Sequence, residues 1–381
     1  MNKKDVAILD FGSKAITVII GDRGVNGTFR IKGKGTADYA GFQNGEFLES
    51  DEVKMAVGLS IANAETEAGV KISEIYVGVP GEFSNVACKE LLISFPKKKK
   101  IADSDIKQLL KNGNSFKNNF AFSAINQSPI YFTLDDGRRM IDPRGIASTK
   151  LKGFISYILA ENNFIDFVQN ILSIIGIKNA GFISDCLAET LYLFDPSIRD
   201  RYVLLVDVGY ITTSVMLGRG DGLLFMKSFS MGGGHISGDL AMCLKIPFPY
   251  AESLKRKLII NWKPTENDTY ELPTADLVTP ISAVATNEIA IDRIDMICTY
   301  ITKCLEQCEF EFPEYIPLYV TGGGLNYIRG IKDHLAKKLG KRVEFIAPAL
   351  PNTARPDYSS EIGLLDVAIS VNEDNNNLIC R

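Results

Sequence analysis

The sequence predicts an α/β protein of two similar halves, with a small α+β domain inserted into the first half. Glycine loops that begin with aspartate follow short apolar, β-like runs at Asp10–Lys14 and again at Asp207–Thr213. A triple glycine, Gly322–Gly324, follows a third such run. A strand that ends in aspartate and turns through glycine presents a carboxylate and backbone N–H groups at one point, which suits a phosphate and its magnesium ion. Two such loops predict two halves that close on one nucleotide.

Length and composition support a two-lobed globular protein. The chain has 381 residues, more than one hydrophobic core usually holds. The formal net charge of −4 gives no electrostatic reason to expect nucleic acid as a partner. We expect no signal peptide, because the apolar run after Met1–Asp5 is too short for one. We expect no membrane-spanning segment either, because no uncharged run approaches the roughly 20 residues that cross a bilayer. Seven cysteines without a CxxC pair indicate reduced thiols in a cytosolic protein.

The N-terminal segment is predicted to form one α/β unit. Its β-prone runs are Val6–Asp10, Ala15–Ile20, Phe29–Gly35 and Ile75–Val79. Apolar residues recur at helical spacing from Val53 to Ala68, and Gly69 is predicted to end that helix.

The composition changes after Pro80-Gly81, which predicts an inserted domain as far as Ile158. We expect short strands there, with one helix near Asp103–Lys111. The run Lys97–Lys100 is interpreted as a solvated turn, with a contact to an acidic partner as the alternative.

The α/β pattern then resumes and repeats the order of the N-terminus. Two helices are predicted first, one over Phe164–Ile175 that stops at Gly176 and one capped by Ser184. The repeated strand, loop and strand comprise Tyr202–Val206, the second aspartate loop and Ser214–Leu217. Residues Asn261–Pro280 are predicted to form a polar surface segment, in which Trp262 packs locally. A long helix (Ile294–Cys308), the strand Leu318–Val320 and a disordered tail (Asn372–Arg381) are predicted to follow.

These motifs resemble a known family. The loops and the order of elements are similar to the actin/Hsp70/sugar-kinase ATPase superfamily, and finer details resemble the bacterial cell-division FtsA family. The segments that carry the resemblance are Met231–Ala241, Ala251–Lys255, Val320–Leu325 and Arg355–Leu365. The resemblance implies a two-lobed actin-like ATPase fold with duplicated RNase H-like domains and an inserted 1C subdomain of the SHS2 type.

The resemblance also implies a division of the chain into subdomains. It assigns residues 1–82, 159–197 and the closing helix 351–371 to subdomain 1A, 83–158 to 1C, 198–234 and 288–350 to 2A, 235–287 to 2B, and 372–381 to a disordered tail.

Site residues are carried over from the family motif by motif. Asp10 and Asp207 are expected to be the catalytic pair that holds Mg²⁺ through water. The expected nucleotide-binding residues are Gly12, Ser13, Lys14, Gly209, Thr212, Thr213, Gly233, Gly234, Glu252, Lys255, Gly322, Gly323 and Gly324. Structural alternatives remain open: an ordinary turn at Asp10 and Gly12, a surface ion pair for Glu252 and Lys255, and a structural role for His235.

The second phosphate loop departs from the family pattern. Tyr210 and Ile211 replace two glycines, and Ser214 replaces a carboxylate. Isoleucine is poor at positive φ, so either the loop follows another path or its side chains occupy space near the terminal phosphate. We therefore expect weak or absent ATPase activity.

The resemblance implies a function in cell division. It suggests an ATP- and Mg²⁺-binding protein that polymerises head to tail and links FtsZ to other divisome proteins in the cytoplasm, at the inner face of the membrane. Lys255, Arg256 and Lys257 are candidate contacts for the FtsZ C-terminal tail. Family members usually end in an amphipathic helix. The segment Asn372–Arg381 lacks one, so indirect membrane attachment is expected unless the sequence is truncated.

Three alternatives stay open. One is a PilM-like pilus scaffold, another a small-molecule kinase of the same superfamily, and the third a paralogue that retains interactions without nucleotide. The choice between ATP and GTP is open as well.

Overall fold

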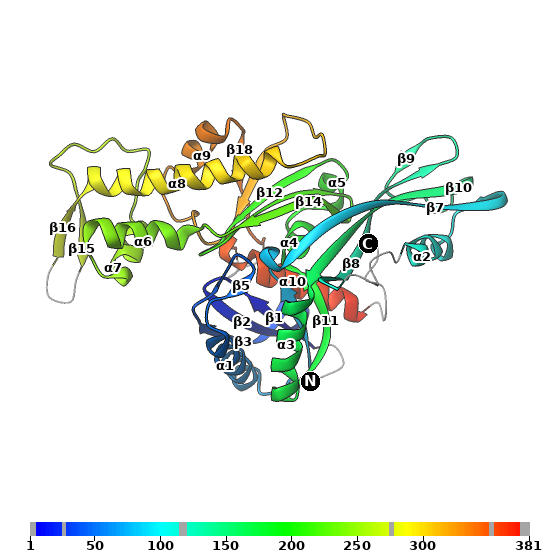
Figure 1. Cartoon of the computed structure of the whole chain (residues 1–381), viewed down its shortest axis with the longest axis horizontal. Coiled ribbons are helices and arrows are strands. Elements are labelled where there is room, and N and C mark those ends of the chain that lie inside the picture. Colours follow the sequence, from blue (N-terminus) through cyan, green and yellow to red (C-terminus); the bar gives the residue numbers. More distant parts are fainter. Residues whose placement is uncertain (1–4, 25–27, 114–119, 274–277, 350–353, 374–381) are drawn as a thin grey trace.

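The computed structural model describes residues 5–24, 28–113, 120–273, 278–349 and 354–373. The first half is built on a five-stranded sheet in the order β11-β6-β1-β2-β3 (Figure 1). Its strands are β1 (Val6–Phe11), β2 (Ala15–Arg23), β3 (Phe29–Asp38), β6 (Glu74–Val79) and β11 (Lys178–Ser184). β1 runs antiparallel to β2 and parallel to β6. All six residues of β1 are buried, as expected for a central strand that is covered on both faces.

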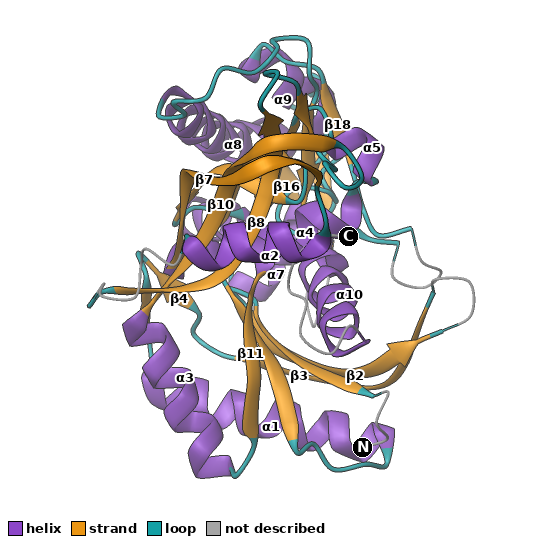
Figure 2. Ribbon diagram, turned by 90° about the vertical axis from the view of Figure 1, so that its right-hand side faces the viewer, coloured by secondary structure: helices purple, strands orange, loops and turns teal. Residues whose placement is uncertain are grey.

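Helices cover both faces of this sheet (Figure 2). One face packs against α1 (Ser50–Ala68) and α3 (Asn162–Ile175), and the other against α4 (Asp185–Leu193) and α10 (Ser359–Glu373). Gly69 and Gly176 have φ of 66° and 81°, so both predicted glycine stops are confirmed. The Ser184 hydroxyl accepts a hydrogen bond from the Leu187 amide at 3.3 Å, which confirms the predicted cap.

The second half repeats the strand order of the first. Its sheet has the order β14-β13-β12-β17-β18. The strands are β12 (Val203–Val208), β13 (Thr213–Arg219), β14 (Gly222–Phe229), β17 (Leu318–Thr321) and β18 (Val343–Phe345). β12 is antiparallel to β13 and parallel to β17, which is the relation of β1 to β2 and β6. The predicted internal repeat is therefore confirmed at the level of topology.

A helical extension projects from the second sheet, on the left in Figure 1. It contains α6 (Gly233–Leu244), α7 (Phe248–Lys255), part of α8 (Ala283–Glu306) and the hairpin β15 (Thr269–Pro273)–β16 (Val278–Ser282). Most of this hairpin comes from the segment that was expected to be a polar surface segment. Trp262 of that segment packs on Tyr270, with ring centres 5.9 Å apart. Helix α9 (Ile331–Leu339) lies between β17 and β18 in the chain.

The inserted region forms an antiparallel sheet in the order β7-β10-β8-β9. Its elements are β7 (Ser84–Lys100), α2 (Asp103–Asn112), β8 (Phe122–Leu134), β9 (Arg139–Met140) and β10 (Ala147–Glu161). The expectation of short strands is wrong, since β7 has 17 residues and β10 has 15. Lys97–Lys100 form the end of β7, so the predicted turn is wrong as well. β10 also continues past the expected boundary at residue 158.

The long strands allow the insert to reach the second half. The Ser156 hydroxyl on β10 donates to the Leu223 carbonyl on β14 at 2.6 Å. Ile130 on β8 is completely buried in the core of the second half. Pairing with a distant strand is a tertiary effect, and local propensity does not reveal it.

The remaining short elements are β4 (Phe42–Gln43), β5 (Glu46–Phe47), α5 (Pro196–Arg199) and the 3₁₀ turns Gly81–Phe83 and Pro356–Tyr358. None of the helices in the described ranges is both long and apolar enough to cross a membrane. Of the expected disordered tail, Asn372 and Glu373 belong to α10, and the rest lies outside the described residues.

Candidate functional site

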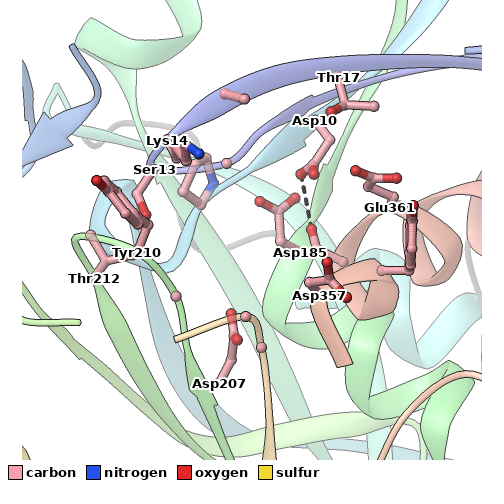
Figure 3. A pocket seen from close by; sticks show the side chains of 18 of the residues that line it. Asp10, Ser13, Lys14, Thr17, Asp185, Asp207, Tyr210, Thr212, Asp357 and Glu361 are labelled. Atoms are coloured by element: carbon pink, nitrogen blue, oxygen red, sulfur yellow. Dashed lines mark hydrogen bonds between the residues drawn. The ribbon is translucent and has the colours of Figure 1, made fainter. Parts of the chain in front are cut away.

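A cavity of about 510 Å³ lies between the two sheets and is lined by residues from both halves (Figure 3). Both aspartate loops, the triple-glycine loop and the start of α10 contribute to it. The predicted site residues that line it are Asp10, Gly12, Ser13, Lys14, Asp207, Gly209, Thr212, Glu252, Lys255, Arg256, Gly322 and Gly323. The fold therefore brings together loops that are far apart in the sequence.

Asp10 and Asp207 occupy equivalent places, at the ends of β1 and β12. Asp10 is 5% exposed and accepts a hydrogen bond from the Ser360 hydroxyl at 2.9 Å. Burial, and then the charge of Glu361, raise the pKa of Asp10 to about 7. Burial raises the pKa of Asp207 to about 6. Both groups thus gain a proton more easily than ordinary carboxylates.

Two further buried acids, Asp185 and Glu189, lie one turn apart on α4 and also line the cavity. Burial raises the pKa of both carboxyl groups, and nearby aspartates add to the effect. Within the described part of the chain, Asp185 Oδ1 and Glu189 Oε2 have no hydrogen-bond partner. Buried polar atoms without partners are rare and indicate a missing water, ion or ligand.

No cluster of three or more His, Cys, Asp or Glu side chains among the described residues has the geometry of a direct metal site. Magnesium held through water, as predicted for Asp10 and Asp207, needs few direct protein ligands and remains a prediction.

A cation–carboxylate pair closes the side of the cavity near α10. Lys34 on β3 forms an ion pair with Glu361, and its Nζ lies 4.4 Å from the centre of the Tyr358 ring. The pair links the first sheet to the closing helix. The Lys34 ammonium group thus places one positive charge in the cavity that the buried acids also line.

The second phosphate loop avoids positive φ at Tyr210 and Ile211. Asn44 and Lys245 are the non-glycine residues with positive φ in the described ranges, so the loop follows a path that L-residues tolerate. The Gly209 amide donates to the Thr212 carbonyl at 2.9 Å, which closes a tight turn. Tyr210 nevertheless lines the cavity. The backbone thus accommodates both substitutions without positive φ, and whether Tyr210 lies near a terminal phosphate stays a prediction.

Several predicted residues hold the loops together and do not line the cavity. Amides of Gly233, Gly234 and Gly324 donate to carbonyls of Gly209, Tyr210 and Val208 at 2.9, 2.7 and 2.7 Å. A Cβ at Gly233 would lie 2.3 Å from the Gly324 carbonyl oxygen, so only glycine allows this contact. Thr213 is fully buried, and its hydroxyl donates to the Met231 carbonyl at 2.6 Å. Thr213, which was expected to bind nucleotide, therefore does not line the cavity in this arrangement, and its hydroxyl is engaged within the protein.

The Glu252–Lys255 pair lies inside the cleft. Lys255 is 3% exposed, and its Nζ donates to Glu252 at 2.8 Å and to the Gly233 carbonyl at 3.0 Å. The predicted partner contact at Lys255 is wrong because this ammonium group is buried, and so is the surface ion-pair alternative. Arg256 is half exposed, whereas Lys257 lies outside the cavity and donates to the Glu271 carbonyl at 2.7 Å.

His235 caps α6. Its Nδ1 accepts a hydrogen bond from the Gly232 amide at 3.1 Å, which confirms the structural role that was one reading of the sequence.

Sequence reasoning missed several lining residues, namely Lys34, Asp185, Glu189, Tyr327, Asp357, Tyr358 and Glu361. Three of them lie in the Arg355–Leu365 segment, whose motif predicts the closing helix and carries no separate signal for a site. Lys34, Asp185 and Glu189 carried no motif signal, because their role depends on how β3 and α4 face the cleft.

The duplicated sheets with one cleft between them define the class: this is an actin-like fold. Solved structures agree. The PilM–PilN type IV pilus biogenesis complex is similar with a TM-score of 0.60 at 15% identity, covering 96% of this chain and 98% of that chain. MreB5 of Spiroplasma citri bound to ADP has a TM-score of 0.57 at 9% identity, covering 98% of each chain. At these identities the likeness concerns the fold alone.

Within this class the chain is similar to the cell division protein FtsA. The family model "Cell division protein FtsA" matches residues 204–363. FtsA of Streptococcus pneumoniae serotype 2 (strain D39 / NCTC 7466) is 23% identical over 374 residues, covering 96% of this chain and 80% of that protein. FtsA of Enterococcus hirae is 22% identical over 379 residues, covering 96% and 83%. The resemblance that the motifs predicted is confirmed.

Proposed function

We propose that the cleft binds a magnesium complex of an adenine nucleotide, ATP or ADP. The cavity between Asp10 and Asp207, the ends of two equivalent strands, carries this proposal. Lys14 and Ser13 supply an ammonium and a hydroxyl for phosphate, and Gly322 and Gly323 let the backbone approach a nucleoside. The unpartnered oxygens of Asp185 and Glu189 fit a hydrated cation in the same cavity.

The chain offers a matched test of this proposal. Calorimetry with MgATP and MgADP should give saturable binding to the wild type, and Asp10→Asn should weaken it at least tenfold. Asp5→Asn is the control, because Asp5 is similarly buried, lies next to the same strand and pairs with Lys32 outside the cavity. Equal loss in both variants would point to general damage. Absence of binding to the wild type at millimolar nucleotide would refute the proposal.

Hydrolysis is proposed to be slow or absent. Phosphoryl transfer depends on donors and metal held in place around the terminal phosphate. In the second loop the Thr213 hydroxyl and the Gly209 amide are engaged within the protein. A steady-state release of phosphate near about one per second, at the low end for enzymes, would contradict this expectation.

We further propose that the protein acts in cell division as an adaptor of the FtsA kind. It would polymerise head to tail and link FtsZ to other divisome proteins at the inner face of the membrane. The match to the FtsA family model and the FtsA relatives support this role. Cosedimentation with nucleotide tests filament formation, and localisation of a fluorescent fusion at the division site tests the setting.

The proposed surface for the FtsZ tail is the extension formed by α6, α7 and the β15–β16 hairpin. With Lys255 buried, Arg256 and Lys257 remain as candidate contacts for an acidic, apolar peptide. Binding of a labelled FtsZ tail peptide, followed by anisotropy, should fall several-fold in Lys257→Glu. Lys337→Glu on α9 is the control charge reversal. Equal binding by both variants would remove this surface from the proposal.

A further inference from the structure

The ring of Tyr210 lies near two ammonium groups of the cleft. Lys14 Nζ is 5.5 Å from the ring centre, and Lys255 Nζ is 5.9 Å from it. Cations within about 6 Å of an aromatic face are attracted to it, and the attraction grows as water is excluded. Lys14 comes from the first half, whereas Lys255 and Tyr210 come from the second. The ring therefore links the halves through charges that a phosphate would otherwise attract.

A direct hydrogen bond joins the two phosphate loops beside this ring. The Ile211 amide donates to the Ser13 hydroxyl oxygen at 3.0 Å. A phosphate group placed between them would accept from each through separate oxygens, which requires about 2.8 Å on either side. The bond and a bridging phosphate therefore exclude each other.

The side chain of Ile211 closes the same gap. A Cβ built on Gly41 would lie 2.6 Å from Ile211 Cδ1, so the isoleucine packs tightly against the first half at this glycine. Parting the loops would expose this apolar contact to water and would lose its burial energy.

Backbone hydrogen bonds within the protein also occupy the amide donors in and beside the second phosphate loop. The Gly209 amide is bonded to the Thr212 carbonyl, and the carbonyls of Gly209 and Tyr210 accept from the first amides of α6. This helix N-terminus is thus satisfied by the loop and has fewer donors for an anion. The cavity volume of about 510 Å³ is ordinary for a small-molecule site, so local closure and not total space limits the ligand.

We propose that the cleft selects a nucleoside diphosphate over a triphosphate, because Tyr210 and Ile211 fill the gap between the loops where a terminal phosphate would bind. This inference rests on the proposed nucleotide-binding function. A diphosphate, one group shorter, reaches Gly12 and Lys14 while the Ser13–Ile211 bond stays intact. A triphosphate must break that bond and displace the ring from Lys14.

The test compares affinities on the full chain. Calorimetry with MgADP and with a non-hydrolysable MgATP analogue should show wild-type binding at least tenfold tighter for the diphosphate. Tyr210→Gly/Ile211→Gly should reduce this ratio to within about threefold. Tyr210→Ala is a milder variant, because alanine leaves the loop backbone less flexible than two glycines do. It should also lower the ratio of the two affinities.

The insert provides a matched control. The Tyr131 ring lies near two cations as well, with the guanidinium carbons of Arg139 and Arg219 at 5.0 and 5.4 Å from its centre, but it does not line the cleft. Tyr131→Ala should leave the ratio unchanged.

The outcomes separate this inference from the function on which it rests. Comparable wild-type affinity for both nucleotides, or tighter binding of the triphosphate, overturns the selectivity and leaves nucleotide binding in place. A diphosphate preference that persists in both loop variants overturns the assignment to Tyr210 and Ile211. Binding of neither nucleotide overturns the proposed function itself.

Discussion

The two halves share one strand order but use their loops differently. In the first half Asp10, Ser13 and Lys14 all face the cleft. In the second half Asp207 and Thr212 line it, while Thr213, Gly233 and Gly234 are engaged in holding the loop to its neighbours. The aspartate therefore has the same position in both sheets. The residues after it decide whether the loop faces the cleft or forms hydrogen bonds with its own neighbours.

The halves also differ at their outer strands. β3 of the first half packs directly on helix α1, with backbone against backbone at Gly35. β14 of the second half lies against the inserted sheet, where a Cβ at Gly222 would meet side-chain atoms first. The outer strand of the first half is therefore packed by a close helix, whereas the outer strand of the second half is packed in part by the insert.

The largest expected effect tests this second difference. A Cβ at Gly35 would lie 1.9 Å from the Ser60 carbonyl oxygen, and backbone cannot move aside easily. Gly35→Ala should therefore lower the free energy of unfolding by roughly 3 kcal/mol or more. At Gly222 the nearest atoms are side-chain carbons of Ser156 and Ile130 at 2.7 and 2.8 Å, so Gly222→Ala should cost only about 1 kcal/mol.

Urea unfolding monitored by circular dichroism measures both changes. Gly181→Ala on β11, whose nearest contact would be 3.5 Å, serves as the control. An equal cost at Gly35 and Gly222 would erase the proposed contrast between the outer strands.

A smaller effect tests the loops. Gly233→Ala should cost about 2 kcal/mol, because its Cβ would clash with the Gly324 backbone and separate the second loop from the triple glycine. Gly238→Ala in the same helix meets nothing within 4 Å and should stabilise by about 0.5–1 kcal/mol. Thermal unfolding of the two variants gives the comparison. Similar melting temperatures would show that the loop contact carries little energy.

The smallest effect concerns the acids between the halves. Burial, and then Asp207, Asp185 and Asp10, raise the pKa of Glu189, so the folded state holds its proton more tightly than the unfolded chain. The stability contributed by the neutral carboxyl is complete below the ordinary glutamate pKa and is lost as the pH rises through the raised value. Glu189→Gln should therefore gain stability relative to the wild type as the pH rises from 5 to 8, with the larger gain at pH 8.

Urea unfolding at the two pH values measures this change, with Glu74→Gln at a half-exposed side chain as control. A stability difference that does not depend on pH would show that Glu189 keeps its charge in the folded protein.

Several features of the fold could be predicted from the sequence. The aspartate loops, the glycine stops at Gly69 and Gly176 and the Ser184 cap are local signals, and each lies where the sequence placed it. The predicted site residues on those loops mostly line the cleft, and their role in nucleotide binding stays a prediction. Thr213 and Lys255 are buried instead of facing a ligand or a partner, because alternation along a strand and helix rotation decide which side chain faces the cleft.

The residues alone indicated the two aspartate-loop units, their repeat and the likeness to FtsA, since these depend on short-range periodicity and on motifs. The folded chain was needed to reveal the length of the inserted strands, the buried acids on α4 and the contact of Tyr210 with lysines of both halves. These features depend on contacts between residues far apart in the chain, and such contacts arise when the two sheets and the insert bury their apolar faces against one another.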